Sequence, residues 1–318
     1  MIRLFAAAGV VLVHSIESSE LEYWGNLFRF AVPFYLFASI YYQSLSLGRN
    51  TERTFGQYVV GRVKRLYLPF LAWSAIYLVA RDIKRVTFLD AGAISLSLSH
   101  LWQGTAYHLW FLPFLLAVSV VQAIVHHTML QRDRRWRWIL SALAIAGGFA
   151  IATVPMPEFW NRTFDSSTYA YVQWWRVLPT ACWALAFAWV MTTGPTIIAV
   201  SSTLGFAGLA LAAGCLVKQA LHGIQLIPRG LTGFGCMLAA LAPWSGPAVS
   251  FMARIGRYGY GIYLCHVLIV ELIRAISSRA QLGPSPWLDI VNFTLSFAGS
   301  LVLVQLLAGS KRLAWLNG

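Results

Sequence analysis

Two ionisable residues near the start of the chain have the spacing of neighbours on one helix face. Arg3 and His14 lie eleven positions apart in the stretch MIRLFAAAGVVLVHS. At about 100° per residue they point within about 20° of each other, with His14 roughly 16 Å further along the helix. An imidazole inside an apolar helix usually faces a polar cavity. His14 is therefore a candidate for the wall of an active site.

Other interpretations of this stretch stay open on its residues alone. Arg3 can anchor a helix at the membrane surface while His14 hydrogen-bonds a neighbouring helix. A basic start before a short apolar run is also typical of a secretory signal peptide, but no A-x-A-like cleavage site follows. The choice between an active site, a membrane anchor and a signal peptide therefore depends on polar residues elsewhere in the chain.

A second candidate site lies in the stretch YVVGRVKRLYLPFLAW. Tyr58, Arg62, Arg65 and Pro69 recur at spacings of three and four residues, which places them on one stripe of a helix. Guanidinium groups at a membrane surface can hold phosphates through charge-assisted hydrogen bonds. Anchoring by basic residues on the cytoplasmic side explains the same run without any ligand.

Two later stretches add further polar groups to apolar segments. His108 and Trp110 begin the run YHLWFLPFLLAV, and Tyr263 and His266 lie in GRYGYGIYLCHVLIVELI with Glu271 close behind. Trp110 alone is typical of an interfacial aromatic belt. The histidines and Glu271 favour a polar cavity, although each can also be a satisfied core group.

Motifs of soluble enzymes and of metal sites are missing from the sequence. It contains no HExxH, no GxSxG, no phosphate-binding GxxxxGK[ST] and no dinucleotide-binding GxGxxG, so we expect no bound metal. The four cysteines stand singly in apolar runs and are expected to be small core residues.

The composition predicts an integral membrane protein. The chain has 318 residues, of which 58% are hydrophobic and 11% charged, and its mean hydropathy is +0.64. The net charge of +13 is spread between apolar runs and forms no separate basic domain, so we expect no nucleic-acid partner.

The apolar runs predict an all-α bundle of about ten transmembrane helices, because only helices or closed barrels cross a bilayer. Lysines and arginines are commoner in the loops on the side of the N-terminus, which predicts that both termini are cytoplasmic. We expect residues 1–318 to form a single membrane domain. The expected spans are 2–16, 26–47, 66–81, 108–126, 137–154, 171–191, 196–217, 230–242, 259–276 and 288–308.

Five stretches in this order resemble the membrane-bound acyltransferase 3 family of bacterial O-acyltransferases. They are the pair formed by Arg3 and His14, VPFYLFAS, GRVKRLYLPFLAW, HLWFLPFLL and GRYGYGIYLCH. The resemblance covers residues 3 to about 310. It implies a protein of the bacterial cytoplasmic (inner) membrane that moves an acyl group, most often acetyl from acetyl-coenzyme A, onto a hydroxyl of a carbohydrate or surface glycan.

The resemblance also implies roles for particular residues. His14 matches the catalytic base and Arg3 its partner on the helix, while Arg62 and Arg65 match the positions that meet the acyl donor. Further motif positions come without a defined role: Tyr58, His108, Trp110, Tyr263 and His266.

Acyl-coenzyme A is expected as a co-substrate, with no permanently bound cofactor. The other implied partners are the lipid bilayer, a glycan or lipid-linked oligosaccharide, and polysaccharide-assembly proteins. Transfer can be direct or pass through an acyl-histidine. The alternatives are a polysaccharide transporter or export component without transferase activity, and a structural membrane protein.

Two departures from the family pattern carry expectations of their own. Relatives usually have more sequence ahead of the arginine at position 3, which predicts a short first span. The second motif continues as Ser39-Ile40, where relatives often have serine-glycine, which predicts looser helix packing at Ile40.

Overall fold

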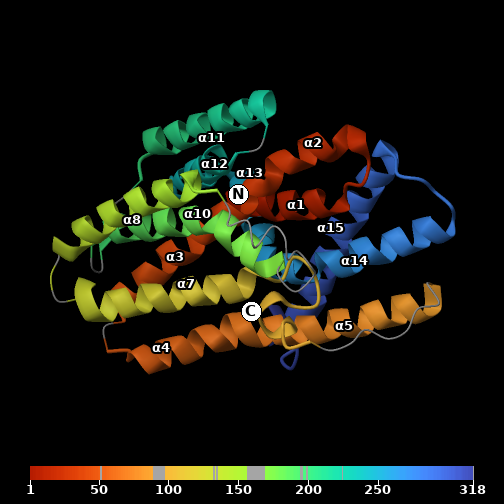
Figure 1. Cartoon of the computed structure of the whole chain (residues 1–318), viewed down its shortest axis with the longest axis horizontal. Helices are drawn as coiled ribbons and strands as arrows, with labels where there is room; N and C mark the ends of the chain where they lie inside the picture. The colour runs from red at the N-terminus through yellow and green to blue at the C-terminus, as the bar shows by residue number, and fades with distance from the viewer. Residues whose placement is uncertain are drawn as a thin grey trace.

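A bundle of helices makes up nearly all of the computed structural model (Figure 1). The structure describes residues 1–50, 52–88, 97–131, 133, 135–155, 169–193, 196–197, 200–223 and 225–317. The longer helices are α1 (Ile2–Ser15), α3 (Ala31–Arg49), α4 (Phe55–Arg62), α5 (Leu68–Phe88), α7 (Phe111–Val125), α8 (Arg135–Thr153), α10 (Tyr169–Met191), α11 (Ser202–His222), α12 (Leu226–Leu241), α14 (Gly259–Arg279) and α15 (Pro286–Gly309).

Short elements connect these helices. They are α2 (Ser19–Leu27), α6 (His100–Gln103) and α13 (Pro247–Gly256), the 3-10 helices η1 (Phe28–Phe30) and η4 (Ala314–Asn317), and the π-helical turns η2 (Val63–Tyr67) and η3 (His126–Leu130). Two strands of two residues, β1 (Thr192–Thr193) and β2 (Thr196–Ile197), pair antiparallel after α10. The predicted all-helical class is thus confirmed apart from this ladder.

Each of the ten predicted spans overlaps a helix. Among the described residues, six helical segments are long and apolar enough to cross a membrane, and α1 and α12 are shorter apolar helices. The number of about ten crossings therefore stays a prediction, while a multi-pass helical membrane protein is supported. The six segments are Phe55–Thr87, Phe111–Leu130, Arg135–Thr153, Ser202–His222, Gly259–Arg279 and Pro286–Gly309.

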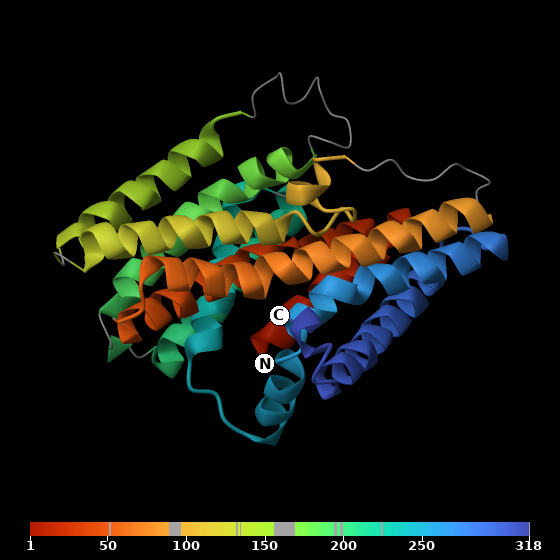
Figure 2. The same ribbon diagram turned by 90° about the horizontal axis from the view of Figure 1, so that it is seen from below.

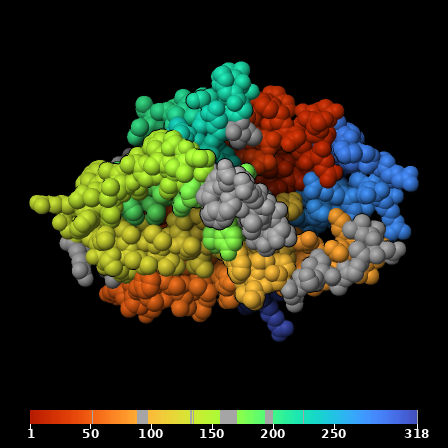
Figure 3. Space-filling view, in the orientation of Figure 1, coloured from red at the N-terminus to blue at the C-terminus, as the bar shows by residue number. Residues whose placement is uncertain are grey.

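Helix α1 is enclosed by α3, α12, α13, α14 and α15. Small residues face its neighbours: Ala6 and Ala7 are buried, and a Cβ on Gly9 would come within 2.8 Å of the Phe28 ring. Small side chains let helix backbones approach closely in a membrane. In the space-filling view α1 and α2 lie between α11 and α14 (Figure 3). One face of the helix that carries His14 is therefore part of the core, while Phe5 on another face is exposed.

Helices α4 and α5 form one continuous helix interrupted by the π-turn η2. Thr54 and Gln57 make a reciprocal capping box at its start. Pro69 has no N–H and cannot bond to the carbonyl of Arg65 four residues earlier. The hydroxyl of Tyr260 donates to that carbonyl instead, at 3.4 Å. The proline of the predicted basic motif therefore accompanies a local change of helix type.

Both ends of the described chain lie near the middle of the long axis of the molecule (Figure 2). Arg3 and Asn317 line the same cavity, and the Nε1 of Trp73 donates to the carbonyl of Leu316 at 3.0 Å. The orientation of both termini in the membrane stays a prediction. The looser packing expected at Ile40 is wrong: its side chain is 0% exposed because α10 and α12 close over α3.

Candidate functional site

Three histidines from distant parts of the chain converge in the bundle. His14 lies in the last turn of α1, His108 lies in the loop before α7, and His266 lies on α14. The ring centroid of His266 is 5.3 Å from that of His14 and 5.0 Å from that of His108, and His14 and His108 are 6.3 Å apart. His108 and His266 are buried, and His14 is partly exposed. The structure thus brings together the three histidines that the sequence placed in separate motifs.

His266 has a defined tautomer in this arrangement. Its Nδ1 lies 2.9 Å from the carbonyl of Tyr263 and 3.2 Å from that of Ile262. A carbonyl only accepts, so Nδ1 carries the hydrogen and Nε2 keeps a lone pair. Nε2 has no hydrogen-bond partner among the described residues. His266 can therefore accept a proton within the cluster.

Tyrosines hold the histidines in place. The hydroxyl of Tyr263 donates to the carbonyl of His108. The hydroxyl of Tyr77 on α5 donates to the carbonyl of Leu264 at 2.8 Å and accepts from the amide of Leu268 at 3.2 Å, which ties α5 to the turn of α14 that carries His266. The ring of Tyr77 also lies edge-on to that of His108, at 5.3 Å.

The carbonyls at the end of α1 are satisfied by side chains from α14 and α15. The Nη2 of Arg274 donates to the carbonyl of His14 at 2.9 Å, and the Nδ2 of Asn292 donates to that of Ser15 at 3.2 Å. Groups at a helix end lack partners within the helix, so these bonds fix where the helix stops. They fix the backbone of His14 as well.

Glu271, which the sequence flagged with His266, belongs to an ion-pair chain. It lies 2.7 Å from Lys84 and 3.2 Å from Arg274, and Arg274 lies 2.7 Å from Glu17. Its carboxylate joins α5 to α14, and Arg274 continues the chain to the segment after α1. Glu271 therefore supports the elements around the histidines.

A cavity of about 90 Å³ opens beside His14 and His108, and we call it the histidine cavity. Trp110 and Tyr263 line it as well, so four motif positions from the sequence meet there. The carbonyl of Trp110 accepts from the Nε1 of Trp174 at 3.0 Å, which fixes the start of α7. The remaining lining residues are Val10, Val13, Phe28, Arg29, Ala31, Val32, Tyr107, Phe111, Gln173, Val177 and Arg229.

A larger cavity of about 730 Å³, the basic cavity, lies toward the other end of α1. Its size falls within the range of small-molecule sites. Six of its lining residues are cationic and none of the described lining residues is acidic: Arg3, Arg53, Arg62, Lys64, Arg65 and Arg257. Arg3 thus lies with Arg62 and Arg65 and lines a different cavity from His14, whose imidazole has the rings of Tyr107, His108 and His266 around it.

Neutral groups orient Arg62 inside the basic cavity. Its Nη2 donates to the Oε1 of Gln43 at 3.0 Å and to the Oγ of Ser119 at 3.2 Å. Its guanidinium carbon lies 5.9 Å from the ring centroid of Tyr58, which explains the place of Tyr58 on the same stripe. None of these partners carries a negative charge. Arg62 is therefore a positioned cation that can still bind an anion.

The two cavities lie end to end along three helices. Each helix lines the histidine cavity with one residue and the basic cavity with another residue one turn away. The spacing is three or four residues, which corresponds to roughly 5 Å along the axis. The pairs are Val32 and Tyr35 on α3, Phe111 and Leu115 on α7, and Tyr260 and Tyr263 on α14.

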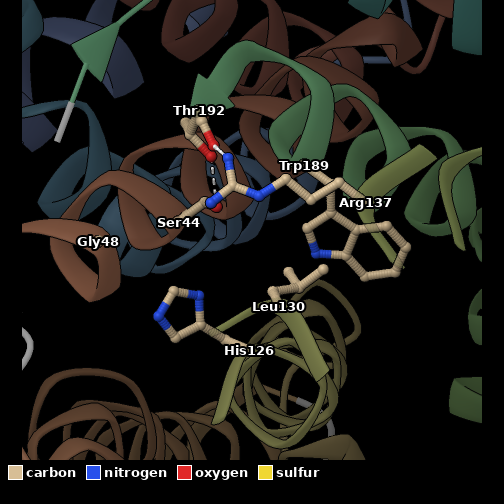
Figure 4. A pocket seen from close by; sticks show the side chains of 7 residues that line it. All are labelled: Ser44, Gly48, His126, Leu130, Arg137, Trp189 and Thr192. Carbon is tan, nitrogen blue, oxygen red and sulfur yellow. Dashed lines mark hydrogen bonds between the residues drawn. The ribbon is translucent and has the colours of Figure 1, made fainter. Parts of the chain in front are cut away.

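A third hollow, between α3, η3, α8 and α10, has a different character (Figure 4). Its volume of about 10 Å³ is close to that of a single water site. Arg137 donates there to the carbonyl of Thr192 at 2.6 Å, and Thr192 bonds to Ser44 at 2.8 Å. Its hydrogen bonds join α3 and α8 to β1, and it has no room for a substrate.

No group of three or more His, Cys, Asp or Glu residues within the described ranges is arranged to hold a metal ion. The four cysteines are free.

A multi-pass helical bundle with a basic cavity and a histidine cavity defines a class of membrane protein suited to group transfer. A family model described as an acyltransferase domain matches residues 1–309. The chain belongs to the acyltransferase 3 family. It has no significant match among curated proteins and none among solved structures.

Proposed function

We propose that this chain transfers an acyl group, acetyl in the first instance, from acyl-coenzyme A to a hydroxyl of a glycan or lipid-linked oligosaccharide. The observation that carries the proposal is the single helical turn between the basic cavity and the histidine cavity. A donor held in one cavity needs to extend only its thioester end into the other. The reaction takes place in the bacterial inner membrane, with the basic cavity on the cytoplasmic side.

The basic cavity suits the phosphates of coenzyme A. Arg62 is oriented by Gln43 and Ser119, and Arg3 and Arg65 supply further positive charge. Guanidinium groups bind phosphate oxygens in a bidentate way, and no carboxylate among the described lining residues competes with them. In this proposal Arg3 acts in donor binding at the far end of the helix that carries His14.

The histidine cavity supplies the base. His14 takes the proton of the acceptor hydroxyl as the oxygen attacks the thioester carbonyl. The new bond joins that oxygen to the acyl carbon, the carbon–sulfur bond breaks, and coenzyme A leaves as a thiolate that takes up a proton. The Nε2 lone pair of His266 lies in the same cluster and can receive the proton from His14 directly or through one water.

Aromatic residues make the histidine cavity suitable for a sugar. Phe28, Trp110 and Phe111 line it together with Tyr107, which is 38% exposed. Sugar rings carry apolar C–H faces that pack on aromatic rings, while their hydroxyls remain free to face His14. Acceptor and acyl group would therefore meet beside the imidazole.

Two measurements test this function. Mass spectrometry of cell-surface glycans with and without the gene should reveal an acyl difference that depends on the protein. Purified protein in vesicles should then transfer label from acetyl-coenzyme A to an acceptor. A pure exporter would move glycan with no dependence on acetyl-coenzyme A, and that result would refute the transferase proposal.

A further inference from the structure

A group of guanidiniums lies at the histidine cavity, apart from the basic cavity. Arg29 on η1 and Arg229 on α12 line the histidine cavity together with Gln173 on α10. We call Arg29 and Arg229 the arginine cluster. Two separate elements, η1 and α12, bring its members together.

The arginine cluster has no anionic partner among the described residues. Their ion pairs involve Lys84, Glu271, Arg274 and Glu17, and none includes a member of the cluster. The Nε of Arg29 donates to the Oδ1 of Asn26 at 2.6 Å, and Asn26 is neutral. Like charges held close together repel, so this arrangement favours binding of a negative group.

The donor does not supply this negative group in the proposed reaction. Coenzyme A phosphates belong in the basic cavity, where Arg3, Arg62 and Arg65 lie. The arginine cluster is on the other side of the helical turn that separates the cavities. A second set of cations beside the base therefore indicates a second anion, carried by the acceptor.

We propose that the acceptor is anionic, and that Arg29 and Arg229 bind its carboxylate or phosphate while its hydroxyl faces His14. This rests on the transferase function proposed above and narrows its substrate class. A cavity of about 90 Å³ corresponds to roughly six to nine water sites, comparable with one sugar ring. The anionic group and the acylated hydroxyl therefore belong to the same or to adjacent units.

Two kinds of acceptor provide that chemistry. A uronic acid carries a carboxylate on the sugar ring, and a lipid-linked oligosaccharide carries a diphosphate where it joins the polyprenyl chain. Arginine binds both groups with paired N–H donors. An assay with charged acceptors and their neutral counterparts distinguishes the carboxylate of a uronic acid from the diphosphate of a lipid-linked oligosaccharide.

The experiment uses the full chain in nanodiscs of neutral phosphatidylcholine with labelled acetyl-coenzyme A. The acceptors are a glucuronate-containing disaccharide, its neutral glucose counterpart, a short-chain polyprenyl-diphosphate-linked neutral disaccharide, and that disaccharide free. The wild type should have a lower KM for at least one anionic acceptor than for its neutral match. The pair that shows the difference identifies the source of the anion.

Arg229→Gln should raise the KM for the preferred anionic acceptor about ten- to hundredfold and leave the neutral match unchanged. Arg229→Lys should restore part of the affinity because it keeps the charge. Arg29→Gln, at an exposed position, gives an independent measurement if Arg229→Gln does not fold. Lys218→Gln is the control: Lys218 is an exposed cation on α11 that does not line the cavity.

Three results would overturn the inference. The first is a wild type without preference for either anionic acceptor, and the second is an equal loss with charged and neutral acceptors in Arg229→Gln and Arg29→Gln. The third comes from a parallel assay in nanodiscs that contain phosphatidylglycerol: an effect of Arg229→Gln seen only in those nanodiscs would assign the cluster to lipid headgroups. If the wild type acylates none of the four acceptors, the transferase proposal itself fails and this inference with it.

Discussion

Asp289 and Ser18 are joined across nearly the whole chain. The Oδ2 of Asp289 accepts from the amide of Ser18 at 3.0 Å and also from its hydroxyl, and the Oδ1 accepts from the amide of Glu17 at 2.9 Å. The amides of Glu17 and Ser18 follow the end of α1, and the buried carboxylate of Asp289 on α15 supplies their hydrogen-bond acceptor. Because His14 lies only three residues before Glu17, this contact helps to place the catalytic base of the proposed reaction.

Replacing Asp289 should therefore affect both stability and transfer. In Asp289→Ala three donors lose their acceptor, and we expect the free energy of unfolding to fall by roughly 1.5–3 kcal/mol. The rate of acyl transfer should fall as well, because the end of α1 is released. Thermal denaturation in detergent and a transfer assay measure the two effects. Thr294→Ala, an exposed change on the same helix, should alter neither, and equal behaviour of both variants would contradict the anchoring role.

His14→Ala should lower the rate of acyl transfer about 10²- to 10⁴-fold, the usual contribution of a general base. Binding of acyl-coenzyme A should be retained, because the basic cavity is one turn or more away from the imidazole. Transfer and donor binding are measured on the same preparation of protein. His222→Ala is the control, since His222 is exposed at the end of α11. If His14→Ala transfers acyl groups at the wild-type rate, His14 is not the general base and another group must take the proton.

Arg62→Gln should raise the KM for acetyl-coenzyme A about ten- to hundredfold through the loss of charge-assisted bonds to phosphate. The acetyl thioester of N-acetylcysteamine contains no phosphate, so its transfer should be nearly unchanged. Comparing the two donors separates a binding defect from a folding defect. Arg254→Gln, an exposed change on α13, should affect neither donor. A loss of the same size with both donors would contradict a role of Arg62 in phosphate binding.

Gly233 tests the packing of α12 against α3. A Cβ at this position would come within 2.4 Å of the Pro33 Cβ and 2.8 Å of the Phe34 amide nitrogen, and the backbone cannot move aside easily. Gly233→Ala should therefore lower the free energy of unfolding by about 1–3 kcal/mol. Gly214→Ala has open space and should be neutral or stabilising by up to about 1 kcal/mol. Denaturation of both variants in detergent checks the prediction, and equal stabilities would contradict it.

The local sequence was sufficient to find the histidines and the basic stripe. A histidine in an apolar run is costly unless it faces a polar cavity, so His14, His108 and His266 stood out one by one. The stripe of Arg62 and Arg65 followed from helical spacing. These signals depend on residue type within a few turns of helix, which is what a single sequence records directly.

Relationships between helices were harder to predict. Arg3 and His14 share a helix face, yet the sequence does not record which neighbours each one meets, and Arg3 lies in the other cavity. Tyr77 and Asp289 carried no motif, since their importance comes from partners on α14 and in the segment after α1. The isolated tyrosine in an apolar helix and the single acid near the start of α15 were the only local signals.

The π-turn η2 between α4 and α5 has a consequence for how the donor cavity is built. A π-turn holds one more residue than an α-helical turn, so the two helices that it joins are offset by about 100° relative to an uninterrupted helix. Arg62 precedes this turn and faces the basic cavity, whereas Tyr77 follows it and meets the histidines. Deleting Val63 would turn the Arg62 guanidinium away from its cavity, although Tyr58, Arg62, Arg65 and Pro69 would all remain in the sequence. The register of the backbone, and not only the identity of its arginines, thus sets where this helix presents positive charge.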